Sequence, residues 1–129
     1  MMAQGFARLF TPDEATDRLP VLVPLVEEMM AARTRLVALQ PELAPVLEKL
    51  LGNGGSRISA AVLESFDRLR ASVRGLESHG VLVKDMERGL LDFPAERDGE
   101  IVFLCWLYGE KTVSHWHGVD AGFASRRPL

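Results

Sequence analysis

The sequence predicts an α+β domain in which a long, kinked, antiparallel helical hairpin precedes a small antiparallel β-meander of three or four strands. Two observations predict this division. Apolar residues recur at helical spacing as far as Gly80, whereas beyond it the apolar runs are short and separated by turn residues. With 129 residues the chain has the length of one domain, and we expect a single domain over residues 1–129.

The first helix is expected over residues 11–51. Thr11 suits the capping position, Pro12 the first helical position, and Glu14 the position that closes a capping box. Downstream, apolar residues repeat every seven positions with a second set three positions later, which is the a/d seam of a coiled coil. The seam consists of Leu22, Leu25, Met29, Ala32, Leu36, Leu39, Leu43, Val46 and Leu50.

Prolines and glycines are expected to kink, break or end the helices in this region. Pro20 and Pro24 predict a kink, and Pro41 a second kink or a break, because proline removes a backbone donor and crowds the preceding turn. The glycine-rich run 52–55 ends the first helix, and a second helix is expected over residues 57–79. Its seam consists of Val62, Phe66, Leu69, Val73 and Leu76.

The two helices are expected to pack antiparallel because a short glycine-rich loop joins them. The first helix is the longer of the two, so part of its seam is left to pack against the sheet or against another subunit. We therefore expect a homo-oligomer, a dimer, that forms through the heptad-patterned helices.

Short β-prone runs follow within residues 81–118, and residues 119–129 are expected to form a C-terminal tail. The Asp-Gly pair at 98–99 favours a two-residue type I′ turn, which predicts a hairpin. The run Ile101–Tyr108 is apolar on both faces, which predicts a central strand covered on each side. The runs are Val81–Val83, which is either a strand or a link to the helices, Gly89–Pro94, Ile101–Tyr108 and Thr112–His117.

The two turns predict a register for the sheet. If the Asp-Gly turn has two residues, Asp92 lies opposite Cys105, and if the turn at 109–111 has three residues, Cys105 lies opposite His115. These residues would then form a row across one face, and His117 would share that face. A slip of one residue at either turn would destroy the row.

Composition argues against two classes of partner. Fifteen basic and eighteen acidic residues give a net charge of −3, which provides no electrostatic attraction to nucleic acid. No apolar run is long enough to cross a membrane, and the N-terminus lacks the apolar run of a signal peptide. A single cysteine, Cys105, cannot form an internal disulfide, which favours a reducing compartment, and we expect a cytoplasmic protein.

The histidines near the C-terminus predict a metal site. His115 and His117 are two residues apart, so on a strand their side chains point to one side. Neutral imidazoles together with a carboxylate suit zinc or another divalent ion. The alternative is a structural network in which one histidine is exposed and the other donates to a neighbouring carboxylate. The candidate ligands are His117, Glu110, Asp120, Asp92 and His115.

Arginines and an aspartate form a second candidate group. Arg126 and Arg127 near the end of the chain, with Arg88, could clamp an anion through bidentate hydrogen bonds. The preferred interpretation is that they form salt bridges with Asp120, Glu110 or Asp85 and fasten the C-terminal tail to the domain.

The remaining candidates are aromatic or sulfur-containing. Trp106 and Trp116, with Phe103, Tyr108 and Phe123, could line a pocket, although packing in the core is the preferred interpretation. Cys105 lies in an apolar strand, where cysteines usually behave as inert, small hydrophobic residues and not as nucleophiles.

Taken together, the motifs resemble the bacterial and archaeal family known as domain of unknown function 2203. The resemblance covers most of the chain, and its specific part is the C-terminal half. It implies a long helical part followed by a small β part, and it implies no established activity. The motifs are the opening run 10–15 with Leu19-Pro20, the run 83–95, Asp98-Gly99, Leu104-Cys105-Trp106, Gly109-Glu110, Trp116-His117 and the run 120–128.

The resemblance also changes the expected metal ligands. His115 is not part of the family pattern, which weakens the two-histidine site. The expectation moves to His117 together with carboxylates that match the signature. The matching positions are Asp85, Gly89, Asp92, Cys105, Trp106, Gly109, Glu110, Trp116, His117, Asp120, Arg126 and Pro128.

The leading hypothesis is a non-enzymatic binding or assembly protein. It would self-associate through its long helix and bind a divalent metal, or a small anionic ligand, at the end of the sheet. One alternative is a small metal-dependent hydrolase that uses His117 as acid or base with Glu110, Asp120 or Asp92. Another is a structural partner-interaction module whose C-terminal signature locks the fold. The sequence does not decide whether the protein is an enzyme.

Overall fold

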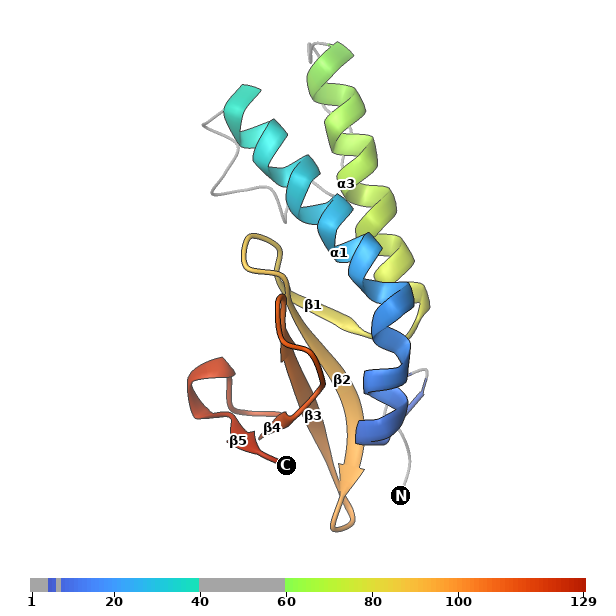
Figure 1. Ribbon diagram of the computed structural model, residues 1–129, viewed down its shortest axis with the longest axis vertical. Coiled ribbons are helices and arrows are strands. Elements are labelled where there is room, and N and C mark those ends of the chain that lie inside the picture. Colours follow the sequence, from blue (N-terminus) through green and yellow to red (C-terminus); the bar gives the residue numbers. More distant parts are fainter. Residues whose placement is uncertain (1–4, 7, 40–59) are drawn as a thin grey trace.

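The computed structural model describes residues 5–6, 8–39 and 60–129. Two helices, α1 (Pro12–Leu39) and α3 (Ala60–Ser78), lie side by side and run in opposite directions, and a sheet follows them in the chain (Figure 1). This arrangement is the expected α+β fold. The parts of the predicted helices that fall within 40–59 lie outside the described residues, as does the second kink expected at Pro41. None of the described helices is long and apolar enough to span a membrane.

Helix α1 begins with the expected capping box. The Thr11 backbone N–H donates to Glu14 Oε1 at 2.9 Å, and the Glu14 N–H donates to Thr11 Oγ1 at 3.1 Å. Helix α1 continues without a break through Pro20 and Pro24, near which a kink was expected. Both prolines are exposed, so water can satisfy the carbonyls that lose a backbone donor.

The apolar seams of both helices are buried inside the chain, but the buried positions of α1 depart from the predicted seven-residue repeat. All five expected positions in α3 are buried. In α1, Val26 is fully buried where Leu25 was expected, and Leu39 is 41% exposed. An α-helix of 3.6 residues per turn drifts relative to a seven-residue repeat, which moves the buried stripe along the sequence. The buried positions of α1 are Ala15, Leu19, Leu22, Val26, Met29, Ala32 and Leu36.

The sheet has five antiparallel strands in the order β1-β2-β3-β4-β5, and the expectation of three or four was wrong. The fifth strand forms within the segment that was expected to be a tail. It is only two residues long, so it has no alternating pattern by which it could be recognised. The strands are β1 (Leu82–Asp85), β2 (Leu90–Arg97), β3 (Glu100–Leu107), β4 (His115–Gly118) and β5 (Arg127–Pro128).

The predicted register is confirmed. Asp98 and Gly99 have φ values of 54° and 83°, as a two-residue type I′ turn requires. Asp92 lies opposite Cys105, and Cys105 lies opposite His115. The predicted row across β2, β3 and β4 therefore exists.

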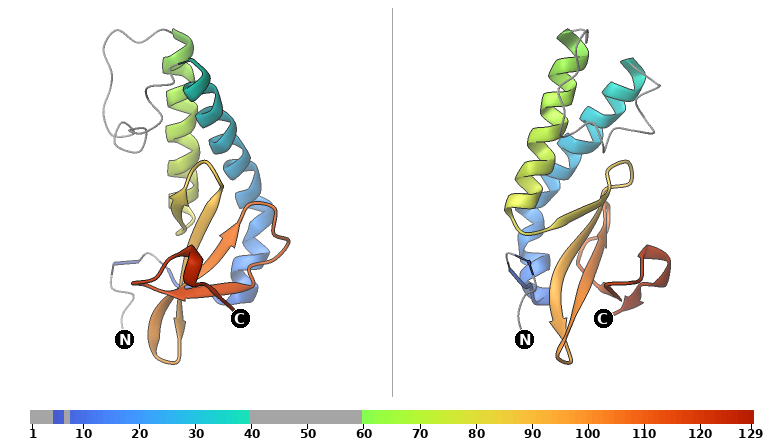
Figure 2. Two further views of the ribbon diagram at one scale, coloured as in Figure 1. Left: turned by 90° about the vertical axis from the view of Figure 1, so that its left-hand side faces the viewer. Right: turned by 180° about the vertical axis from the view of Figure 1, so that it is seen from behind.

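Strands β2 and β3 are buried on both faces. One face, which includes Phe93, Leu104 and Trp106, belongs to the same core cluster as the helices. The other face carries Asp92 and Cys105. Figure 2 shows that β4, β5 and the C-terminal segment lie on the side of β2 and β3 away from the helices. Polar residues are thus enclosed on the second face of the sheet.

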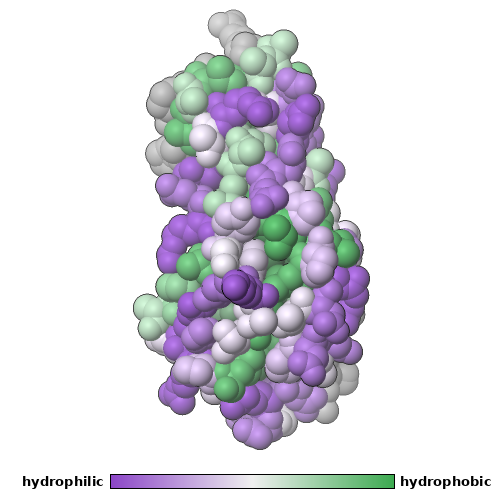
Figure 3. Space-filling model, viewed as in Figure 1, coloured by the Kyte–Doolittle hydropathy of each residue, from purple (hydrophilic) through white to green (hydrophobic). Residues whose placement is uncertain are grey.

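The surface is mixed in character. Figure 3 shows hydrophilic and apolar residues interspersed on one side of the molecule. The large apolar side chains with high exposure come from different elements: Val21, Leu39, Leu63, Tyr108, Val119 and Leu129.

Candidate functional site

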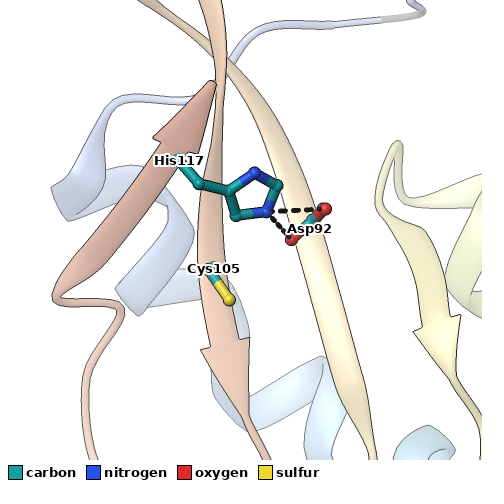
Figure 4. A group of neighbouring side chains, drawn as sticks. All are labelled: Asp92, Cys105 and His117. Carbon is teal, nitrogen blue, oxygen red and sulfur yellow. Dashed lines mark hydrogen bonds and ion pairs between the residues drawn. The ribbon is translucent and has the colours of Figure 1, made fainter. Parts of the chain in front are cut away.

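A buried histidine–aspartate pair lies at the centre of the second face. His117 on β4 is 5% exposed and Asp92 on β2 is 1% exposed. His117 Nε2 lies 3.1 Å from each carboxylate oxygen of Asp92 (Figure 4). Because β3 lies between these strands, the imidazole reaches across a whole strand to meet its partner.

The surroundings of the imidazole fix how many protons the pair holds. His117 Nδ1 lies 2.8 Å from the Gly118 carbonyl oxygen, which can only accept, so Nδ1 carries a hydrogen. Nε2 faces carboxylate oxygens, so a second proton lies either on Nε2 or on Asp92. In both arrangements the pair has no net charge.

Burial favours the neutral form of the carboxyl group. It raises the pKa of Asp92 above its ordinary value of 3.8, against the opposing effects of His117, the Lys84 charge and a hydrogen bond from Cys105. The Asp92 carboxyl group therefore stays protonated to higher pH than an exposed aspartic acid would.

Cys105 is the third member of this group. It is fully buried on β3, the strand between β2 and β4, and its side chain lies beside the contact between His117 and Asp92 (Figure 4). Burial, and secondly the Asp92 charge, raises the pKa of its thiol to about 11, although Arg126 acts in the opposite direction. The group is a thiol at neutral pH, and a thiol is a poor nucleophile. We call Asp92, Cys105 and His117 the buried triad.

Glu110 and Arg126 form a bidentate ion pair beside the buried triad. Arg126 donates to Glu110 Oε2 at 2.6 Å and to Oε1 at 3.2 Å. Glu110 Oε1 also accepts the Leu107 backbone N–H at 2.8 Å, and the Glu110 carbonyl accepts Trp106 Nε1–H at 2.9 Å. The pair therefore fastens the C-terminal segment to the end of β3, as the preferred interpretation of the arginines proposed.

These contacts determine the charge of Glu110. Burial alone would raise the pKa of Glu110, but hydrogen bonds from Arg126 and from the Leu107 N–H outweigh it, so the pKa is lowered from 4.5. An Arg126 N–H also lies 4.0 Å from Cys105 Sγ, which links the ion pair to the buried triad. The carboxylate of Glu110 is held by these donors, and the carboxylate in contact with His117 is that of Asp92.

The Phe103 ring, already considered as a possible pocket residue, borders the buried triad, and Phe6 and Lys84, which sequence reasoning missed, lie beside that ring. The Phe103 ring meets the His117 ring edge-on, with centroids 5.7 Å apart, and Phe6 meets Phe103 at 5.6 Å. Lys84 Nζ lies 5.1 Å from the Phe103 ring centroid. The predicted register places Phe103 opposite His117, which the structure confirms. Nothing in the local sequence of Phe6 or Lys84 indicates proximity to β3.

Several predicted site residues lie apart from the buried triad. His115 is half-buried, and its Nδ1 is 3.1 Å from Ser114 Oγ. Asp120 is exposed on the turn after β4. Asp85 accepts the backbone N–H groups of Glu87 and Arg88 at 2.9 and 3.0 Å, so it orders the turn between β1 and β2.

The predicted aromatic residues divide between core and surface. Trp106 is 1% exposed and belongs to the core. Phe123 is half-buried between two arginines, with Arg88 at 4.7 Å and Arg126 at 4.4 Å from its ring centroid. Trp116 is half-buried and packs on the edge of the core.

The buried triad fits a metal ion of the zinc type. Its donor atoms, an imidazole nitrogen, a cysteine sulfur and a carboxylate oxygen, lie within 4.8 Å of one another. Ligand atoms around tetrahedral zinc are roughly 3.3–3.8 Å apart, given bonds of about 2.0–2.3 Å. Nε2 and the carboxylate are already 3.1 Å apart, so the sulfur must approach by no more than about 1.5 Å.

The sequence was compared with known proteins. No curated protein and no solved structure matches the chain. The family described as "Uncharacterized conserved protein (DUF2203)" matches residues 8–129. That match spans nearly the whole chain and includes both described helices and all five strands. The chain therefore belongs to the DUF2203 family, as the sequence motifs indicated.

Proposed function

We propose that this protein is a non-enzymatic binding protein whose buried triad takes up one zinc-like divalent ion. One observation carries the proposal: three buried side chains of metal-ligating types, from three adjacent strands, place their donor atoms within 4.8 Å of one another. Buried polar side chains are uncommon unless they are paired or bind a metal.

The donor set selects the kind of ion. Nitrogen and sulfur donors favour zinc and similar transition metals, whereas magnesium and calcium require oxygen ligands. The Gly118 carbonyl accepts the Nδ1–H of His117, which leaves Nε2 as the ligating atom. A metal-binding histidine usually has such a partner, because it fixes the orientation of the ring.

A bound ion would join β2, β3 and β4, because each of these strands supplies one ligand. Binding to the folded state alone stabilises it by about 2.7 kcal/mol when the free ion is at 100 times its Kd. All three ligands are buried, which supports a structural or storage role over the hydrolase alternative. Glu110, one of the partners proposed for His117 in that alternative, is engaged by Arg126.

Metal analysis of protein purified without an affinity tag tests this function. We expect one equivalent of zinc to bind, and His117→Ala and Cys105→Ser each to abolish stoichiometric binding. His79→Ala is the matched control, because His79 lies after α3, away from the buried triad. Equal zinc binding by the wild type and by His117→Ala would refute the proposal.

We propose in addition that two copies associate through the end of the helical pair that is farthest from the sheet. The exposed Leu39 ends α1 and the exposed Leu63 lies in the first turn of α3. Figure 1 shows these two helix ends together, away from the strands. The seam residues between Ala15 and Leu36 are buried within the chain, so they are not available for this contact.

A further inference from the structure

A second candidate site lies on the other face of the sheet, around Trp116. The guanidinium carbon of Arg97, at the end of β2, lies 4.7 Å from the Trp116 ring centroid. The guanidinium carbon of Arg127, on β5, lies 5.8 Å from the same centroid. Trp116 and Arg127 are directly paired between β4 and β5, and Arg97 reaches the ring across β3. Two guanidinium groups from separate strands therefore lie near one indole ring.

The two cations lie near the same ring. Because their distances from one point are 4.7 and 5.8 Å, the two guanidinium carbons are at most 10.5 Å apart. Like charges at this separation repel each other, and an exposed cation–π contact contributes only about 0.5–1 kcal/mol. A ligand that carries negative charge would relieve the repulsion.

Neither cation is neutralised by a carboxylate. Six arginines in the described part of the chain form ion pairs, but Arg97 and Arg127 have no carboxylate oxygen within 4.0 Å among the described residues. Glu100 lies directly opposite Arg97 in the β2–β3 pairing, so its carboxylate is the group placed to compete with a ligand for Arg97. Both arginines are exposed, so their donors are accessible to a ligand.

We propose that Arg97, Trp116 and Arg127 form a binding site for a small, multiply charged phosphate compound. Guanidinium groups match the geometry of phosphate oxygens and form paired hydrogen bonds with them. Two linked phosphates reach two separated guanidiniums more readily than a single phosphate does. The indole holds the arginine side chains in place, which reduces the conformational entropy lost on binding. The site shares no residue with the buried triad.

Calorimetric titration with inorganic pyrophosphate at low ionic strength tests this site, using metal-free protein because pyrophosphate chelates metals. We expect saturable one-to-one binding that weakens at least tenfold in Arg97→Gln and in Arg127→Gln. Arg97→Lys keeps the charge and should weaken binding less than Arg97→Gln. Glu100→Gln removes the competing carboxylate and should strengthen binding. Orthophosphate should bind more weakly than pyrophosphate, and adenosine diphosphate tests whether an organic group adds affinity.

Two controls separate this site from other effects. Arg74→Gln removes an exposed arginine of α3 and should leave pyrophosphate binding unchanged. His117→Ala should also bind pyrophosphate as the wild type does, because the buried triad is independent of this site. Absence of saturable binding, or equal weakening by Arg74→Gln, would overturn the proposal. Unchanged thermal unfolding of the Arg97 and Arg127 variants excludes loss of folding as the cause.

Discussion

His117 on β4 reaches across β3 to Asp92 on β2, and its Nε2 is 3.1 Å from both carboxylate oxygens. The Gly118 carbonyl accepts from the other ring nitrogen. Both ring nitrogens of His117 therefore have hydrogen-bond partners, and the pair with Asp92 holds one shared proton. A divalent ion that replaced this proton and the Cys105 thiol proton would leave the charge of the buried triad unchanged.

The raised pKa of Asp92 predicts how the stability of the metal-free protein depends on pH. Between pH 3.8 and the higher pKa of the folded state, the folded protein binds more protons than the unfolded protein. The stability contributed by Asp92 is therefore full below pH 3.8 and is lost as pH rises through the folded-state pKa. Asp92→Asn should remove this loss, so its free energy of unfolding relative to the wild type should increase with pH.

Urea unfolding at several pH values in the presence of a chelator measures this effect. Asp120→Asn is the control, because Asp120 is exposed. An Asp92→Asn curve parallel to that of the wild type across the pH range would show that the carboxyl group has no raised pKa.

Loss of the Glu110–Arg126 ion pair should destabilise the fold. The side chains are 25% and 17% exposed, so Arg126→Gln leaves a partly buried carboxylate without its bidentate donor and should cost about 1–3 kcal/mol. Arg88→Gln is the comparison, since Arg88 is more exposed and 4.0 Å from Asp85, and it should cost less than about 1 kcal/mol. Chemical denaturation measures both, and equal losses would contradict the assigned role.

The same ion pair predicts sensitivity to acid. Because the pKa of Glu110 is lowered in the folded state, its contribution to stability is present above pH 4.5 and is lost as pH falls through the folded-state value. Glu110→Gln should therefore lose less stability than the wild type on acidification. Thermal unfolding between pH 6 and pH 3 measures this difference, and identical acid dependence of the two proteins would count against it.

Gly89 should tolerate no side chain. Its φ is +71°, and a Cβ atom would lie 2.7 Å from Tyr108 Cβ and 2.9 Å from Met30 Sδ. Gly89→Ala combines backbone strain with steric overlap and should destabilise by about 2–4 kcal/mol. Gly99 has a similar φ of +83° but nothing within 4 Å of an added Cβ, so Gly99→Ala should cost only the strain, about 1–2 kcal/mol. Equal losses in denaturation experiments would contradict the close packing at Gly89.

Much of the fold was predictable because local rules determine it. The capping box at Thr11 and the Asp-Gly turn are set by neighbouring residues, and the turn determines the register that places Asp92 opposite Cys105. By contrast, the phase of α1 depends on packing, which buries Val26 in place of Leu25. β5 is formed by pairing with β4, and two residues carry too little pattern to predict it.

His117 and Asp92 of the buried triad were among the expected metal ligands, whereas Cys105 was expected to be an inert core residue. Register placed His115 and His117 on one face, but only the three-dimensional path of the strands decides which imidazole meets Asp92. Glu110 and Arg126 were both candidates, and their pairing follows from their opposite charges. Phe6 reaches Phe103 from the other end of the chain, and such a contact leaves no signal in a single sequence.

Sedimentation velocity tests the proposed association of two copies. We expect a dimer at micromolar concentration and a shift to the monomer in Leu63→Glu. Val119→Glu is the matched control, because Val119 has the same 48% exposure but lies after β4, at the sheet. A monomeric wild type, or an equal shift by Val119→Glu, would contradict association through the end of the helical pair.

Cobalt(II) substitution tests the metal site most directly, because the absorption spectrum reports the ligands themselves. Zinc-type sites accept cobalt(II), and a thiolate ligand gives a charge-transfer band in the near ultraviolet. We predict that the wild type shows this band at one equivalent, that Cys105→Ser lacks it, and that added zinc removes it. A wild-type spectrum with no thiolate band, or a band that persists in Cys105→Ser, would contradict metal binding by Asp92, Cys105 and His117.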